Sequence, residues 1–217
     1  MQTAILIPAY NTGSKISSLI DKISTNYKCL IIIVDDGSSE PIKIDSDDVV
    51  VIRNKVNRGK GYSLVKGMQY AYKHGIDSVV TIDSDGQHDP VYINDFINYP
   101  SNVDIVIGSR TFNQKMPIHR RISNIITSYI ISLFIGSRVI DSQSGYRRYL
   151  LKKIITIDTV EKGFQFESEI LIRAGRDGLT FGNINISTIY NNEISNINKV
   201  FDTIRFIKMI FVLIIWK

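Results

Sequence analysis

Residues 30–38 read LIIIVDDGS, an unbroken apolar run that stops at two aspartates. Residues 79–88, VVTIDSDGQH, repeat this pattern of a β-branched run that ends in carboxylates. Such continuous runs are typical of strands that are buried on both faces of a parallel sheet. Because ligands bind at the carboxyl ends of parallel strands, Asp35 and Asp83 are predicted to face one cleft.

Helical and strand-like segments alternate around these two runs. Short apolar runs predict further strands over Ala4–Pro8, Val49–Ile52, Asp104–Ile107 and Asn185–Tyr190. Apolar residues at helical spacing predict helices over Ser14–Ser24, Lys60–Lys73, Ile122–Ile135 and Phe164–Ala174. No linker or repeat interrupts these segments, so residues 1–217 are predicted to form one α/β domain, with helices on both faces of a mostly parallel sheet.

The composition is that of a globular protein in a reducing compartment. Of the 217 residues, 44% are hydrophobic and 22% are charged, which makes disorder a poor reading of the chain. Cys29 is the single cysteine, so no disulfide can form within the chain. The first residues lack a cleavable signal pattern, and no apolar run reaches the ~18 residues that a spanning helix needs. A cytoplasmic location is therefore expected.

Charge is distributed unevenly along the chain. Residues 1–109 carry 10 Lys and Arg against 13 Asp and Glu, giving −3, whereas residues 110–217 carry 16 against 8, giving +8. The basic half is predicted to attract phosphate groups or an anionic lipid surface. The chain shows no recognition-helix pattern and no aromatic-basic interleaving, so nucleic acid is not an expected partner.

The carboxylates at the two strand ends suit a nucleotide and a metal ion. In Asp35-Asp36-Gly37-Ser38, a carboxylate can accept hydrogen bonds from a base or a ribose, and the glycine permits a tight turn. Asp83 and Asp85 can share a hard divalent cation such as Mg²⁺ or Mn²⁺, with Gln87 as a further oxygen ligand. A calcium loop of the EF-hand type is excluded because its downstream acidic ligands are missing.

Arginines follow these carboxylates along the chain. Gly108-Ser109-Arg110 comes directly after a predicted strand and places a guanidinium near the same cleft, where arginine suits bidentate contact with phosphate. His88 is either a phosphate contact or a packed loop histidine. Later loops are predicted to add positive charge from Arg120, Arg121, Arg147 and Arg148.

In order and spacing, the motifs resemble glycosyltransferase family 2, and most of all its dolichyl-phosphate mannose synthase and polyprenyl-phosphate glycosyltransferase branch. The resemblance covers nearly the whole chain. Its motifs are Pro8-Ala9-Tyr10-Asn11, Asp35-Asp36-Gly37-Ser38, Asn57-Arg58-Gly59-Lys60-Gly61, Asp83-Ser84-Asp85-Gly86-Gln87-His88-Asp89-Pro90, Gly108-Ser109-Arg110, Asp141-Ser142-Gln143-Ser144-Gly145-Tyr146-Arg147 and Gly163-Phe164-Gln165-Phe166-Glu167.

The resemblance implies a GT-A fold and inverting, metal-dependent hexosyl transfer from a UDP or GDP sugar, with Mg²⁺ or Mn²⁺ as cofactor. Where the family loop usually has an acidic residue after Tyr-Asn, this chain has Thr12 and Gly13, which weakens the base-recognition part of the likeness. Carried over by position, the nucleotide sugar would be held by Pro8, Tyr10, Asn11, Asp35, Asp36, Lys60 and Asp83, and the metal by Asp83, Asp85 and Gln87. Acceptor or phosphate contacts would come from Arg110, Arg121, Ser123 and Arg147, and catalytic roles from Asp85, Asp141 and Arg110.

The acceptor decides whether the reaction needs a base. A lipid phosphate has a second pKa near ~6 and is largely ionised at neutral pH, so it needs none. A saccharide hydroxyl is protonated and needs a carboxylate, for which Asp141 is the candidate. Asp141 could instead pair with a neighbouring arginine, and Glu169 could do the same. A catalytically silent protein that binds nucleotide sugars is a further alternative.

Two apolar segments suggest a membrane surface. In residues 118–136, basic residues precede a helix that is mostly apolar. Residues 201–217 end in eight apolar residues, Met209–Trp216, with a lysine on each side. Such helices either lie in the membrane interface or pack on the sheet. The chain is therefore expected to be peripheral to the cytoplasmic face of a membrane, alone, with a membrane-protein partner or as a homo-oligomer.

Overall fold

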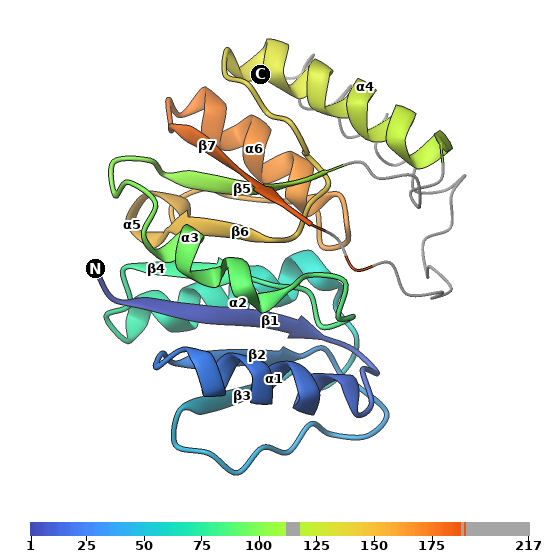
Figure 1. Cartoon of the computed structure of the whole chain (residues 1–217), viewed down its shortest axis with the longest axis vertical. Helices are drawn as coiled ribbons and strands as arrows, with labels where there is room; N and C mark the ends of the chain where they lie inside the picture. The colour runs from blue at the N-terminus through green and yellow to red at the C-terminus, as the bar shows by residue number, and fades with distance from the viewer. Residues whose placement is uncertain (112–117, 188, 190–217) are drawn as a thin grey trace.

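The computed structural model describes residues 1–111, 118–187 and 189, within which seven strands form one sheet. Six strands run parallel, and β6 is reversed because it pairs antiparallel with both β4 and β5. The order across the sheet is β3-β2-β1-β4-β6-β5-β7 (Figure 1). The strands are β1 (Thr3–Ala9), β2 (Ile31–Asp35), β3 (Val49–Arg53), β4 (Ser78–Thr81), β5 (Ile105–Arg110), β6 (Arg147–Leu150) and β7 (Phe181–Ile186).

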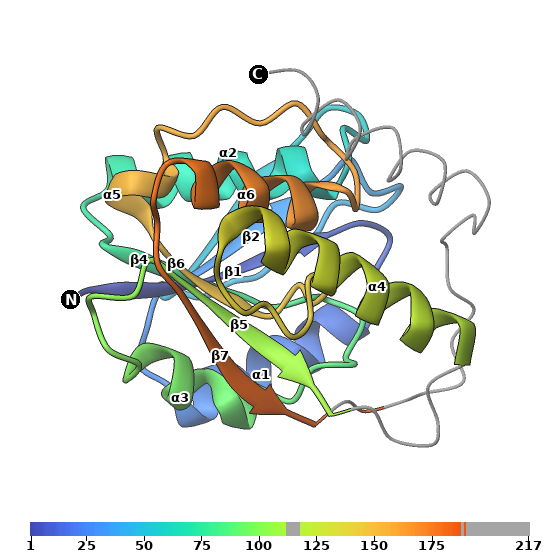
Figure 2. The ribbon, with the colours of Figure 1, turned by 90° about the horizontal axis from the view of Figure 1, so that it is seen from above.

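Helices cover both faces of this sheet, as the sequence predicts. On one face lie α1 (Lys15–Asn26) and α3 (Ile93–Ile97), the latter preceded by the 3-10 turn η1 (Pro90–Tyr92). On the other face lie α2 (Lys60–Lys73), α5 (Leu151–Ile154) and α6 (Phe166–Arg176) (Figure 2). Two apolar clusters result, one on each side of the strands, which is the three-layer arrangement of an α/β protein.

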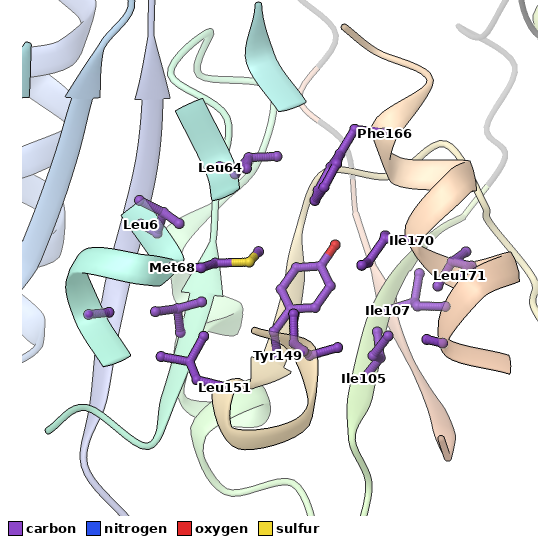
Figure 3. Packing of buried hydrophobic residues seen from close by; sticks show 14 of the residues in the cluster. Leu6, Leu64, Met68, Ile105, Ile107, Tyr149, Leu151, Phe166, Ile170 and Leu171 are labelled. Carbon is purple, nitrogen blue, oxygen red and sulfur yellow. The ribbon is translucent and has the colours of Figure 1, made fainter. Parts of the chain in front are cut away.

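The alternation of side chains along β1 separates the two clusters. Ile5 and Ile7 pack on the α1 side, whereas Leu6 points to the α2 side, because successive residues of a strand face opposite ways. Figure 3 shows the α2 side, where Leu64 and Met68 of α2 lie across from Phe166 and Ile170 of α6. The core therefore fixes α2 and α6 side by side above the sheet, and both helices begin at its carboxyl edge.

Most predicted elements are present, and the differences lie mainly in the second half of the chain. The helix over Lys60–Lys73 has the predicted bounds, and the early strands differ only at their ends. The last strand, β7, begins four residues before the predicted Asn185, because the turn that follows α6 is short. Strand β6 and the short helices α3 and α5 were not predicted at all. The expectation of Arg120, Arg121, Arg147 and Arg148 in loops is wrong, because the first two lie in the helix over Ile118–Ile135 and the last two in β6.

Helix α4 (Ile118–Ile135) extends the predicted helix and turns its polar side inward. Asn124, Thr127 and Ser128 are buried, while most of its large apolar side chains are exposed. Ile131 belongs to the core, and the half-buried Ile135 packs against it beside Gly175 of α6. No helix among the described residues is long and apolar enough to cross a membrane. The apolar segment 201–217 lies outside the described residues.

Candidate functional site

The carboxyl edge of the sheet collects the predicted site residues from four strands. Asp35 ends β2, Arg110 ends β5, and Asp83 follows the end of β4 by two residues. Because β6 is reversed, its beginning lies at this same edge, which brings in the preceding loop 141–146. The loops after β2 and β4 flank β1, since the Asp36 amide donates to the Ala9 carbonyl and the Ile82 amide donates to the Leu6 carbonyl.

The first aspartate of the β2 loop holds the loop itself. The completely buried carboxylate of Asp35 accepts hydrogen bonds from the amides of Ser38 and Ile42, at 2.9 and 3.3 Å, and from the Arg53 guanidinium. Burial alone would raise the pKa of Asp35, but these donors outweigh burial and lower it. The Asp35 carboxylate therefore holds the loop after β2 in place, and its contact with a nucleotide stays a prediction.

The second aspartate organises the approach to α2. Asp36 accepts hydrogen bonds from the Asn54 side chain at 2.7 Å and from the amides of Arg58 and Gly59 at 2.9 and 2.7 Å. Gly59 has a φ of 98°, a conformation that side chains disfavour, and it is the residue just before the helix. Asp36 thus fixes the turn from which Lys60 projects.

The loop after β1 presents an aromatic ring at the same edge. Pro8 is buried within the strand, whereas Tyr10 is exposed. Asn11 has a φ of 51°, and it is held by reciprocal hydrogen bonds of 2.9 Å, from its amide to the Ser38 hydroxyl and from the Ser39 amide to its side chain. The Tyr10 ring is consequently carried on a fixed turn, in a position where a flat ligand could stack on it.

The centre of the site is an ion-pair cluster that the sequence predicted only in part. The Lys60 ammonium lies 2.6 Å from an Asp83 carboxylate oxygen and 2.7 Å from Glu167 at the start of α6. The Asp83 and Glu167 side chains are only 23% and 4% exposed. Burial would raise the pKa of Asp83, but the Lys60 charge and His88 hold it well below its usual value, and the two carboxylates raise the pKa of Lys60 against the effect of burial.

A glycine makes room for this cluster. A Cβ on Gly145 would come within 2.6 Å of an Asp83 oxygen and 2.7 Å of the Lys60 nitrogen. The loop before β6 therefore lies directly on the Lys60–Asp83 pair, with no space for a side chain between them. Gly145 was part of a recognised motif, yet its position against Asp83 could not be inferred from spacing alone.

The second carboxylate of the predicted metal pair lies beside the first. Burial, followed by the negative charge of Asp83, raises the pKa of Asp85. The Gln87 amide donates to Asp85 at 2.9 Å, and the Gln87 carbonyl accepts from the Ile189 amide at 3.0 Å. His88 is buried, with Nε2 3.6 Å from Asp83 and its ring against Tyr146, so it is a packed histidine.

These residues fit a hard divalent cation that also binds a ligand. Two like-charged carboxylates that are close enough to shift a pKa repel each other, and a cation between them would relieve that repulsion. Among the described residues, no group of three or more His, Cys, Asp or Glu could hold a metal ion. Mg²⁺ is commonly bound by one or two carboxylates together with substrate phosphates, and the pair suits that kind of site.

Arg110 and Asp141 are bound to each other. The guanidinium donates to both Asp141 oxygens, at 2.6 and 2.9 Å, and the Arg110 amide and the Asn124 side chain donate at 3.2 and 2.8 Å. Burial would raise the pKa of Asp141, but Arg110 and the other donors lower it. Of the two roles open to Asp141, the structure therefore shows pairing with an arginine. Glu169 likewise pairs with Arg173, at 2.6 Å.

The expected role of Arg147 in binding an acceptor phosphate requires correction. Arg147 is completely buried, and its guanidinium donates to the carbonyls of Ser142, Ser144 and Glu167, each at 2.7 Å. It therefore holds the loop before β6 in place. Of the other three predicted acceptor residues, Arg110 binds Asp141, and Arg121 and Ser123 are exposed on the first turns of α4.

Known proteins resemble the chain in sequence and in fold. The model of the family described as glycosyl transferase family 2 matches residues 4–168. A UDP-N-acetylglucosamine–dolichyl-phosphate N-acetylglucosaminyltransferase of Methanococcus voltae is 33% identical over 86% of this chain and 85% of its own length. A polyprenol monophosphomannose synthase of Mycolicibacterium smegmatis is 25% identical over 82% of this chain and 74% of its own length.

Solved structures confirm the predicted fold class. Glucosyl-3-phosphoglycerate synthase from Mycobacterium tuberculosis, in complex with Mn²⁺ and UDP-glucose, superposes with a TM-score of 0.73 at 18% identity, over 98% of this chain and 78% of that one. The same enzyme has also been solved with Mg²⁺ and UDP, with a TM-score of 0.71. At this level of identity, the likeness establishes the shared architecture of the sheet and its helices.

Proposed function

Because the chain belongs to glycosyl transferase family 2, we propose that it transfers a sugar, with inversion, from a nucleoside-diphosphate sugar to a polyprenyl phosphate, using Mg²⁺ or Mn²⁺. The observation that carries this proposal is the Asp83–Asp85 pair at the carboxyl end of β4, held beside Lys60. The curated relatives named above act on dolichyl or polyprenol phosphates, and they match most of this chain.

On the donor side, Asp85 and Gln87 would hold the cation together with Asp83. Bound there, the cation would stabilise the negative charge that builds on the departing diphosphate. Tyr10 would stack on the nucleotide base, from a turn that Asn11 fixes to the β2 loop. Lys60 keeps Asp83 ionised, so this carboxylate can receive a cation without first losing a proton.

On the acceptor side, the state of Asp141 favours a phosphate over a hydroxyl. A carboxylate with a lowered pKa is a weaker base, and both Asp141 oxygens accept from Arg110. A phosphate monoester needs no base at neutral pH, because it is already largely ionised. Arg110, oriented by Asp141, and Arg121 would then attract the phosphate.

The direct test is an assay with farnesyl phosphate as acceptor and a panel of UDP and GDP sugars in the presence of Mn²⁺. We expect one donor to give a prenyl-phosphate sugar and the free nucleoside diphosphate. Methyl glycosides are the matched saccharide acceptors, and they should remain unmodified. Product formed on the glycosides alone would reject the lipid-phosphate acceptor, and donor binding without transfer to either would favour a silent nucleotide-sugar-binding protein.

Asp141→Asn separates a positioning role from a base. We expect slower transfer, because Arg110 loses its charged partner, but the pH profile should keep its fall below ~6, since that fall belongs to protonation of the acceptor phosphate. In the wild type, the fall in transfer rate should have the same midpoint pH, because the lowered pKa of Asp141 leaves its carboxylate ionised where the acceptor phosphate titrates. Initial rates at saturating acceptor, measured from pH 5 to 8, would check this, and a profile that flattens in the variant would mean that Asp141 is the base.

We also propose that α4 lies on a membrane surface. Its outward residues Ile122, Ile126 and Phe134 are exposed, while its polar residues are buried, which is the reverse of an ordinary surface helix. Arg121 and Arg138, near its two ends, are exposed as well and would attract anionic headgroups. The lipid acceptors of the curated relatives support a place at a membrane surface, and we propose the cytoplasmic face.

Ile122→Ser with Ile126→Ser is expected to lower partition onto anionic phospholipid vesicles about a hundredfold or more, because burying each of the two isoleucines is worth roughly 1.5–3 kcal/mol. Tyr72→Ser on α2, at a similarly exposed apolar residue, should leave partition unchanged. Vesicle sedimentation measures both. Equal binding by all three proteins would contradict the proposal and leave a membrane-protein partner or a second copy as the cover of this face.

A further inference from the structure

An open groove of about 560 Å³ runs along one side of α4. Of the residues that line it, Tyr129 and Leu133 are exposed and Ser128 is buried. The groove, called the α4 groove below, is lined by Ile125, Ser128, Tyr129, Ser132 and Leu133 of the helix and by the turn 136–140.

The α4 groove begins beside the acceptor side of the site. Its lining residues Ile125 and Ile140 adjoin Asn124 and Asp141 in sequence, and those two are joined by a hydrogen bond of 2.8 Å. Asp141 in turn binds Arg110. One end of the groove therefore lies next to Asp141, which is the partner of Arg110. The lining of the groove does not include Asp83 or Asp85.

A cation stands on the same side of the helix. Arg121 precedes Ile125 by four residues and Ser128 by seven, the spacing that places residues on one helical face. From Arg121 to Leu133 the helix rises ~18 Å, at 1.5 Å for each of twelve residues. Along that length the helix presents a guanidinium and then isoleucine, tyrosine and leucine, while Arg138 of the turn lines the opposite wall. An apolar chain with an anionic head at the Arg121 end matches the helix side of the groove.

We infer that the α4 groove binds the isoprenoid chain of the acceptor, with the phosphate at the Arg110 and Arg121 end. This assignment rests on the proposed transfer to a polyprenyl phosphate, and it deepens that proposal by naming where the chain lies. The arginines bind the phosphate, and the groove adds affinity for the isoprene units that are nearest to that phosphate. Longer acceptors should consequently bind more tightly than short ones, even without a bilayer.

Two soluble acceptors test this in the absence of vesicles. Farnesyl phosphate and dimethylallyl phosphate share the phosphate and differ in chain length, three isoprene units against one. The groove variants are Tyr129→Ser and Leu133→Ser, at side chains that are 64% and 65% exposed, and the control variants are Ile126→Ser and Phe134→Ser, 53% and 48% exposed on the same helix but outside the groove. These exposures mean that all four variants should fold, which thermal unfolding verifies.

For the wild type we expect a lower KM with farnesyl phosphate than with dimethylallyl phosphate. The groove variants together should raise the KM for farnesyl phosphate about tenfold, or about 1.4 kcal/mol, and leave kcat and the KM for dimethylallyl phosphate unchanged. The control variants should match the wild type with both acceptors.

Two other outcomes would distinguish a wrong groove from a wrong function. If the wild type transfers to both prenyl phosphates but the groove variants keep its KM values, or the controls lose as much, the chain does not lie in the groove, and the apolar face serves a bilayer or a second copy. If the wild type modifies neither prenyl phosphate, the proposed function itself is wrong, and the inference falls with it.

Discussion

Asp85→Ala is expected to abolish sugar transfer while the fold survives. The side chain would hold the cation that offsets charge on the leaving diphosphate, and losing a single preorganised contact of this kind costs about 10²- to 10³-fold in kcat. The variant should unfold at the wild-type temperature or slightly above it in the absence of metal, because burial and the charge of Asp83 already disfavour the Asp85 carboxylate. Transfer rates and thermal unfolding measure the two effects.

A neighbouring carboxylate provides the matched control. Asp89 lies on the same loop and accepts a hydrogen bond from the Val91 amide at 3.1 Å, a capping role that Asp89→Asn would preserve. Asp89→Asn should transfer sugar normally and keep the rise in unfolding temperature that Mn²⁺ with the nucleotide gives, whereas Asp85→Ala should lose that rise. Near-native transfer by Asp85→Ala would remove the cation from this mechanism.

The predictable part of the molecule is the part that local sequence determines. Unbroken apolar runs identified the central strands, and their ends correctly identified where Asp35, Asp83 and Arg110 emerge. Helical periodicity also gave the bounds of α2, whose inward residues pack on Leu6. Each of these features depends on the residues of one segment and on the general rule that parallel strands end together.

Strand β6 was missed because its sequence contradicts its position. RRYL carries two arginines, which are rarely buried without partners, so the segment reads as a loop. Both arginines are nevertheless fully buried, because carbonyl oxygens accept their hydrogen bonds. Arg147 donates to Ser142 and Ser144 of the preceding loop and to the distant Glu167, and Arg148 donates to the distant Phe96, Tyr99, Pro100 and Val103. Such acceptors come from the tertiary fold, and no local pattern announces them.

The ion-pair cluster was incomplete for a similar reason. Lys60 and Asp83 were both expected at the donor, but their direct pairing and the third member, Glu167, depend on α2 and α6 lying side by side. Glu167 belongs to a motif named in the sequence analysis, and the predicted helix over Phe164–Ala174 places it in the first turn. Its distance of 2.7 Å from Lys60 follows from core packing rather than from spacing.

Lys60→Met is expected to cause the largest loss of stability. It removes the positive charge between two largely buried carboxylates, Asp83 and Glu167, and breaking such a pair typically costs about 3–5 kcal/mol. For a domain of this size, the unfolding temperature falls by roughly 2–4 °C for each kcal/mol. Lys66→Met on the same helix is the control, because the Lys66 ammonium donates to the neutral Asn54 side chain and the Arg53 carbonyl and forms no ion pair among the described residues. Its loss should cost far less. Thermal unfolding in EDTA compares them.

The cause of that loss is tested by pH and by a second substitution. The pKa of Asp83 is lowered in the wild type, so its stabilising contribution is present above the usual range of aspartate and is lost as the pH falls towards the lowered value. Without Lys60, the buried carboxylates should instead gain stability on protonation, so the gap between wild type and variant should narrow as the pH is lowered. Glu167→Gln should likewise recover part of the deficit in the Lys60→Met background while destabilising the wild type. If Glu167→Gln changed both backgrounds equally, Lys60 would not be acting through this carboxylate, and the cluster would not be the unit that holds Asp83 in place.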